Sequence, residues 1–142
     1  MMRKIIAVVV AVIFLAPFAS TSPVADEPEL KLKAPRATFM KPRMPNESSR
    51  AVTIRISATL ENLDEVADLE EYYCLEQVWE WDDETDSEYA PDCDPYEEGM
   101  EIETRFSGTH QYRYPGTYTV WLRLQRNGKT VIAGNARVQI RG

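Results

Sequence analysis

Two segments of the sequence alternate between apolar and polar residues, and this period of two constrains the fold more than any other feature. Residues 52–60 and 117–125 carry the pattern in full, and residues 101–107 repeat it in a shorter form. In the first segment the apolar side consists of Val52, Ile54, Ile56, Ala58 and Leu60. A period of two is typical of a β-strand that buries one face. The sequence therefore predicts sheets with one buried face, with no alternation of strands and helices.

Further strand and turn signals complete the all-β pattern. Residues 75–81 predict a strand and residues 131–141 predict the last one, with a kink or bulge at Gly134-Asn135. Asn127-Gly128 is a two-residue hairpin signal. Apolar residues at every third position in 63–72 predict one or two helical turns. Short strands between turn signals predict an all-β, immunoglobulin-like antiparallel β-sandwich of about seven strands.

The first 36 residues carry a targeting pattern rather than a core. Two basic residues precede an apolar run of 15 residues that ends at Ala19, which is typical of a secretory signal peptide. A membrane-spanning helix needs about 20 such residues, so we expect no stable membrane span. Residues 20–36 contain three prolines, which favours a flexible linker. We expect a signal peptide at 1–19, a linker at 20–36 and one domain at 37–142, in a secreted, periplasmic or cell-surface protein.

Cys74 and Cys93 are the only two cysteines of the chain. Export would place them in an oxidising compartment, where paired cysteines form disulfides. We therefore expect one structural bridge between them rather than a redox thiol or a metal ligand. A closed loop of this size stabilises a fold by about 3 kcal/mol in the chain-entropy model.

Acidic residues gather in the middle third of the chain. The net charge is −7, and residues 61–103 hold 19 acidic residues without one lysine or arginine. A nucleic-acid partner requires a basic surface, so this distribution argues against one. It favours a cation or a basic partner surface near residues 61–103.

Two stretches of the chain resemble the PKD-type (polycystic kidney disease repeat) immunoglobulin-like domain of exported bacterial proteins. Residues 79–85, Trp-Glu-Trp-Asp-Asp-Glu-Thr, are similar to the family's W-D-F-G-D-G-T turn. Residues 110–120 are similar to its H-x-Y-x-x-x-G-x-Y-x-V segment. The resemblance covers about residues 37–141. The residues that carry it are Trp79, Trp81, Asp83, His110, Tyr112, Gly116 and Tyr118.

The resemblance assigns structural roles to several of these residues. Asp83 and His110 would brace neighbouring loops by hydrogen bonds. Independently of the family, Trp79 is placed like the core tryptophan of a sandwich, and Tyr118 like a tyrosine whose hydroxyl bonds back to the backbone across a corner. The family usually has glycine where this chain has Asp82 and Glu84, so we expect a reshaped turn, held by the Cys74–Cys93 bridge.

Three kinds of functional site are considered in addition to these structural roles: a catalytic site, a calcium site and a binding surface. His110, the only histidine, lacks the sequence signature of a catalytic triad, and a small sandwich offers little cleft for a pair of catalytic carboxylates. Asp82, Asp83 and Asp86 are candidate calcium ligands, although their spacing is not that of an EF-hand. Trp121 faces outward from its strand and is a candidate contact platform. With it, the candidate binding surface comprises Glu80, Glu84 and Glu88.

These observations predict a non-catalytic binding or spacer module outside the cytoplasm, without a required cofactor. Its expected partner is a protein or a glycan at the cell exterior. The alternative is a calcium-stabilised structural module that self-associates through its acidic loop region. Neither the identity of the partner nor the oligomeric state follows from the sequence.

Overall fold

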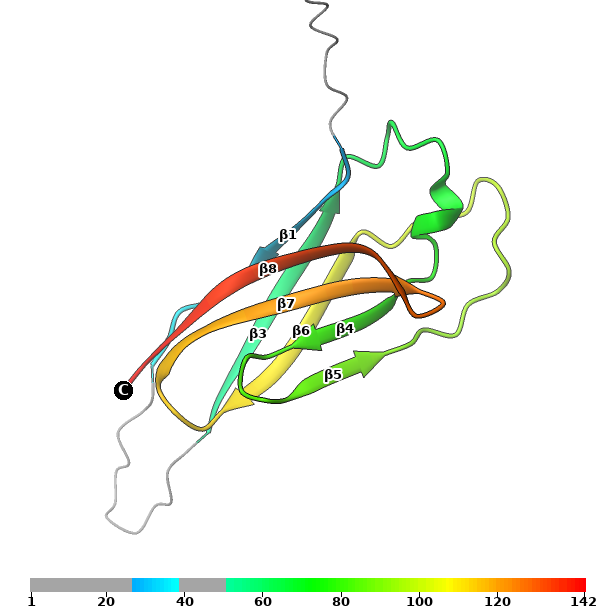
Figure 1. Ribbon diagram of the computed structural model, residues 1–142. Coiled ribbons are helices and arrows are strands. Elements are labelled where there is room, and N and C mark those ends of the chain that lie inside the picture. Colours follow the sequence, from blue (N-terminus) through cyan, green and yellow to red (C-terminus); the bar gives the residue numbers. More distant parts are fainter. Residues whose placement is uncertain (1–26, 39–50) are drawn as a thin grey trace, which may run out of the picture.

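The computed structural model describes residues 27–38 and 51–142 and shows eight strands in two sheets (Figure 1). The chain order is β1 (Glu29–Lys33), β2 (Ala37–Thr38), β3 (Val52–Glu61), β4 (Glu76–Glu80), β5 (Asp86–Tyr89), β6 (Arg105–Tyr112), β7 (Gly116–Arg126) and β8 (Lys129–Arg141). A single 3-10 turn, Leu69–Tyr72, precedes β4, within the segment where one or two helical turns were predicted. No α-helix occurs in the described ranges.

The two sheets stack as a sandwich, so the predicted all-β, immunoglobulin-like class is confirmed. One sheet has the order β1-β3-β6 and the other the order β2-β8-β7-β4-β5. Every pairing is antiparallel except the short one between β2 and β8. The two strands β1 and β2 lie within and beside the expected linker, which brings the described strands to eight instead of about seven.

The core lies between the inner faces of the sheets, where the alternation of the sequence places it. In β3 every second side chain from Ile54 to Leu60 is buried, and in β7 the same holds from Val120 to Leu124. Burial of such apolar area is the main stabilising term of the fold. The largest fully buried side chains are Trp81, Tyr112, Ile56, Leu122, Leu124, Val120 and Val138.

Residues 29–33, expected in a flexible linker, instead form β1. They pair with β3 in register, from Glu29 opposite Glu61 to Lys33 opposite Ser57. Leu30 is buried, while the charged residues beside it face solvent, so the segment is a short example of period-two alternation. The folded part thus begins before residue 37. The predicted signal peptide, 1–19, and residues 20–26 of the predicted linker lie outside the described residues.

The strand predicted at 101–107 is displaced toward the C-terminus. Residues 101–104 are irregular, and β6 continues to Tyr112, which places His110 on a strand rather than in a loop. The apolar pattern of the sequence stops before Gly108, although this glycine faces the core, so the pattern did not reveal the second half of β6. A Cβ at this position would lie 2.8 Å from Trp79 ring atoms and 2.9 Å from Trp81. Gly108 therefore lets β6 approach both indoles.

The predicted hairpin at Asn127-Gly128 is confirmed, whereas the irregularity in the pairing of β7 and β8 lies at a different position from the one predicted. Asn127 and Gly128 both have positive φ, as a two-residue turn of this kind requires. Gly134 pairs regularly with Leu122, and the register shift lies instead at Leu124/Gln125. A Cβ on Gly134 would overlap the carbonyl oxygen of Leu30. The glycine therefore permits β1 to cross close over β8.

Candidate functional site

The residues singled out in the sequence fall into three places: the β4–β5 turn with its neighbours, the outer face of the larger sheet, and a groove between β5 and β6. The turn comprises residues 82–84, and the Trp81 amide closes it by donating to the Thr85 carbonyl over 3.1 Å. Asp82 and Glu84 have φ values of 65° and 66°. Asp82 and Glu84, which stand where the resembling family usually has glycine, thus both adopt the left-handed backbone that favours glycine.

The disulfide does not hold this turn. Cys74 and Cys93 are joined, with their Cα atoms 6.1 Å apart, and they flank the open ends of the β4–β5 hairpin. The turn lies at the opposite end of that hairpin (Figure 1). A hydrogen bond to the neighbouring strand helps to hold it instead, because the Asp82 carboxylate accepts the Thr119 amide of β7 over 2.8 Å.

Replacing Glu84 by glycine should raise the free energy of unfolding by about 0.5–1 kcal/mol. A left-handed backbone costs an L-residue about 1–2 kcal/mol, and the extra freedom of glycine in the unfolded chain offsets part of that gain. Urea denaturation measures the change. The matched control is Glu88→Gly on β5, where the backbone has no positive φ and the same change should destabilise. Equal effects at both positions would contradict the role of the turn.

Asp83 and His110 meet at the side of this turn. The Asp83 carboxylate lies 2.7 Å from Nε2 of His110 and accepts the Thr85 amide over 3.2 Å and the Thr85 hydroxyl. The His110 ring is stacked on Trp81, with centroids 4.6 Å apart, and meets Tyr112 edge-on. The bracing contact that the resemblance implies between Asp83 and His110 is therefore present.

The Asp83 contacts lower its pKa. Partial burial acts to raise the pKa of this carboxyl, but the hydrogen bonds from Thr85 and His110 and the charge of His110 outweigh it, so the pKa lies below 3.8. A lowered folded pKa stabilises the fold above the unfolded pKa, and this contribution is lost as the pH falls through the folded pKa.

Asp83→Asn should therefore cost about 1–2 kcal/mol of unfolding free energy near pH 6, because it removes a charged acceptor from several donors. The difference from the unmodified chain should shrink below about pH 4, the ordinary range of the carboxyl. Urea denaturation from pH 6 to acidic pH measures both curves. A difference that stays constant into the acid range would show that the Asp83 charge does not stabilise the fold.

The three polar groups are not arranged as a catalytic relay. Asp83 and Thr85 both approach the same ring nitrogen, Nε2 of His110, at 2.7 and 3.4 Å. A triad requires the acid on one nitrogen and the nucleophile on the other. The Thr85 hydroxyl moreover donates its proton to Asp83, so it is not held as a nucleophile toward His110. The geometry can brace the turn against β6.

Two tyrosines continue this brace into β7. The Tyr112 hydroxyl donates to the Trp81 carbonyl over 2.7 Å, and burial raises the pKa of Tyr112, which keeps this donor protonated. The Tyr118 hydroxyl donates to the Tyr114 carbonyl over 2.8 Å, the backbone contact expected of a corner tyrosine. Gly116, the first residue of β7, lies between Tyr114 and Tyr118 in the chain.

The three candidate calcium ligands do not converge. Asp82 accepts the Thr119 amide, and Asp83 is occupied by His110 and Thr85. Asp86 lies exposed at the start of β5. Throughout residues 27–38 and 51–142 no three His, Cys, Asp or Glu side chains are grouped so that they could hold a metal ion.

Trp121 and Glu80 lie on the outer face of the larger sheet, as their strand registers predict. They are opposite one another on β7 and β4. Arg123 links them, because its guanidinium lies 5.4 Å from the centroid of the Trp121 ring and 3.1 Å from the Glu80 carboxylate. Trp121 is therefore half-buried beneath a cation, not a freely exposed platform.

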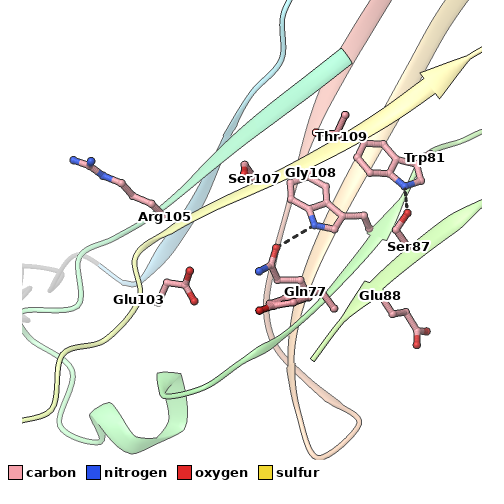
Figure 2. A pocket seen from close by; sticks show the side chains of 11 residues that line it. Gln77, Trp81, Ser87, Glu88, Glu103, Arg105, Ser107, Gly108 and Thr109 are labelled. Atoms are coloured by element: carbon pink, nitrogen blue, oxygen red, sulfur yellow. Dashed lines mark hydrogen bonds between the residues drawn. The ribbon is translucent and has the colours of Figure 1, made fainter. Parts of the chain in front are cut away.

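A groove of about 380 Å³ separates β5 from β6, where both sheets end on the same side of the sandwich (Figure 2). Its floor is formed by Trp79 and Trp81, which stack with ring centroids 5.3 Å apart. The Trp81 indole N–H donates to Ser87 over 2.9 Å, and that of Trp79 to the Gln77 carbonyl oxygen over 3.2 Å. The volume lies in the range of ligand pockets.

Gln77 is the unusual member of the groove. It is only 7% exposed, yet its amide nitrogen makes no hydrogen bond to the described residues, while its oxygen accepts from Trp79. A buried polar group without a partner is costly, so such groups in native proteins are normally met by water or a ligand. No motif in the sequence marks Gln77 as a candidate site residue.

The rim of the groove carries charge and one exposed aromatic ring. Tyr89, at the end of β5, is 59% exposed. Glu88 and Glu103 flank the groove, and the Arg105 side chain extends away from the indoles in Figure 2. Glu88 was a predicted contact residue, whereas Ser107, Thr109 and Arg105 were not, because no sequence signal places β6 beside β5. Glu84 remains in the turn.

No helix within the described ranges is long and apolar enough to cross a membrane. No family model, no curated protein and no solved structure matches this chain.

Proposed function

We propose that the chain is a non-catalytic binding module that acts outside the cytoplasm and contacts a protein or a glycan through the groove between β5 and β6. The observation that carries the proposal is the groove itself. It places the unpartnered amide of Gln77 and a stacked pair of indoles between two strands that each have one free edge. Concave apolar sites with a few polar groups are the usual form of binding sites.

The location outside the cytoplasm is supported by the Cys74–Cys93 bridge. Structural disulfides persist in oxidising compartments and are rare where thiols are kept reduced. The apolar run at residues 5–19 adds the expectation of export from the sequence.

The non-catalytic assignment is supported by the only histidine. His110 is held between Trp81 and Tyr112 and receives both polar neighbours on one nitrogen. A catalytic histidine of the triad type has its orienting acid on one ring nitrogen and the nucleophile on the other, which this arrangement does not provide. The same contacts support our proposal that the chain is a divergent PKD-type module, since Asp82 and Glu84 keep the positive φ of the family's glycines.

The binding function is tested with a charge reversal at the rim, Glu88→Lys with Glu103→Lys. Capture of proteins from the source's own envelope fraction and of glycans on an array is compared with the unmodified chain. The reversal should weaken capture about tenfold or more, since buried or rim charges tune both affinity and partner choice. The matched control is Glu65→Lys with Glu71→Lys, which changes the net charge equally on exposed residues away from the groove. Equal capture by both variants would rule out the groove as the binding site.

A further inference from the structure

The two free strand edges at the groove suggest the chemistry of the partner, and this inference rests on the proposed binding function. We propose that the groove binds an extended, cationic peptide segment of another protein as an added β-strand along the outer edge of β6. Apolar side chains of the segment would lie over Gly108 and Trp79, and its basic side chains would face the acidic rim.

The backbone of β6 offers unpaired groups to such a strand. Among residues 27–38 and 51–142, β6 pairs with β3 alone. The bond from the Leu60 amide to the Thr104 carbonyl sets the phase of this ladder. Because hydrogen-bonded pairs alternate in an antiparallel ladder, Gly108 and every second residue bond to β3, and Ser107 and Thr109 direct their N–H and C=O groups to the open edge. Regularly spaced donors and acceptors of this kind match another extended polypeptide.

The edge of β6 also lacks the usual protection against strand addition. Native edge strands are commonly guarded by charged side chains or proline. Arg105 at the start of β6 is the single charged residue of the strand, and from Phe106 to Tyr112 it contains no Lys, Arg, Asp, Glu or Pro. The groove is lined, in contrast, by Glu88 of β5 and by Glu103, which would repel an acidic strand. The groove therefore selects by charge rather than excluding every strand.

The opposite side of the sandwich shows how such a strand is accommodated. There β1 pairs with β3, on the side of β3 opposite β6, and crosses β8 at Gly134. Its Leu30 side chain is buried between the sheets, while Lys31 and Lys33 face outward. The side between β5 and β6 has no equivalent strand among the described residues. A segment with the same alternation of apolar and basic residues suits this side.

The indoles favour a peptide over a glycan. Trp79 is 3% exposed and Trp81 is 1% exposed. Sugar rings bind proteins by lying on an accessible aromatic face, which neither indole offers; the accessible ring at this groove is that of Tyr89, at its rim. The unpaired groups at the groove are the Gln77 amide and the backbone of an edge strand, which are the groups that hydrogen-bond a peptide.

The test uses a seven-residue peptide of alternating lysine and leucine, with a glutamate/leucine peptide as its matched control, titrated into the purified chain by calorimetry. We expect the lysine peptide to bind about tenfold or more tightly than the glutamate peptide. N-methylation of alternate residues separates strand addition from attraction of charge alone. When the methylated residues are those whose N–H groups pair with β6, binding should weaken about tenfold or more. When the methylated residues are the intervening ones, whose N–H groups point away from β6, binding should be retained.

A variant of the protein makes the same test from the other side. Thr109→Pro removes an outward N–H, and the preceding Gly108 has no Cβ to clash with the proline ring. It should weaken the lysine peptide about tenfold, whereas Thr109→Val, which keeps the N–H, should bind like the unmodified chain. A melting temperature equal to that of the unmodified chain shows that each variant is folded. Should the proline variant not fold, the two methylated peptides decide the matter on the unmodified chain.

Equal binding of the two N-methylated peptides, or no binding of the lysine peptide, would overturn strand addition. If the lysine peptide fails while a glycan is captured in a manner sensitive to the reversal at Glu88 and Glu103, the binding function stands and the peptide assignment falls. If that reversal changes no capture at all, both proposals fall.

Discussion

Replacing Trp81 by alanine is expected to lower the free energy of unfolding by about 4 kcal/mol, the typical loss for a large aromatic side chain in a core. Trp81 is among the most buried side chains of the protein and stacks on both Trp79 and His110. Its indole N–H also donates to Ser87, so the change leaves that hydroxyl without its donor. Urea denaturation of the purified chain, followed by tryptophan fluorescence and circular dichroism, measures the loss.

The matched control is Trp121→Ala, the same chemical change on the outer face of the larger sheet. Trp121 is only partly buried and lies beneath Arg123, so we expect a loss of about 1 kcal/mol, the scale of a partly exposed cation–π contact with some packing. The ratio of the two losses tests the register of β4 and β7. A one-residue slip would exchange the faces of every side chain. Similar losses for both tryptophans would therefore contradict the register.

The parts of the fold that the sequence predicted correctly are those in which side-chain pattern and backbone agree. Residues 52–60 alternate without interruption, and they coincide with β3 apart from its last residue. The hairpin at Asn127-Gly128 follows from the positive φ that those two residues tolerate. Trp79 is buried and Tyr118 bonds back to Tyr114, because each role depends on one residue and its immediate neighbours.

The misplaced elements share a different cause, since they depend on contacts between distant segments. β6 was placed too early because Gly108 interrupts its apolar pattern, and only the two indoles from β4 explain that glycine. Gly134 was interpreted as a bulge, although its role is to admit β1. β1 itself was missed because five residues beside several prolines are a weak pattern. A single sequence shows none of these approaches.

The candidate site was predicted in part for the same reason. Glu88 was predicted as a contact residue, and Trp79 and Trp81 were singled out only for structural roles; all three lie in the segment from β4 to β5, which are consecutive in the chain. The other wall of the groove, with Ser107 and Thr109, belongs to the second sheet. In the β4–β5 turn, hydrogen bonds to Asp82 and Asp83 hold two non-glycine residues, Asp82 and Glu84, in the left-handed region, which the sequence alone did not predict. Tertiary contacts here outweigh a local preference.

Removing the disulfide by Cys74→Ser with Cys93→Ser should lower the free energy of unfolding by about 3 kcal/mol, the chain-entropy value for a loop of this length. The two cysteines are 19 residues apart, and the loop that they close contains β4, its turn and β5. Reduction of the unmodified chain should reproduce the loss. This second measurement separates the bridge from the serine substitution at Cys74, where the backbone has a φ of 54°.

The bridge should also act on the folded state, because β5 pairs only with β4 in the part of the chain that the structure describes, and all four residues of β5 are exposed. A purely entropic crosslink destabilises every element alike when it is removed. We expect more: amides of Ser87 and Tyr89, which bond toward β4, should exchange with solvent by local opening in the bridge-free chain, while β7 keeps its protection. Since β5 forms one wall of the groove, peptide binding should weaken together with this opening. Uniform loss of protection across β5 and β7 would assign the bridge to the unfolded state alone, and two titratable thiols in the untreated protein would contradict the bridge itself.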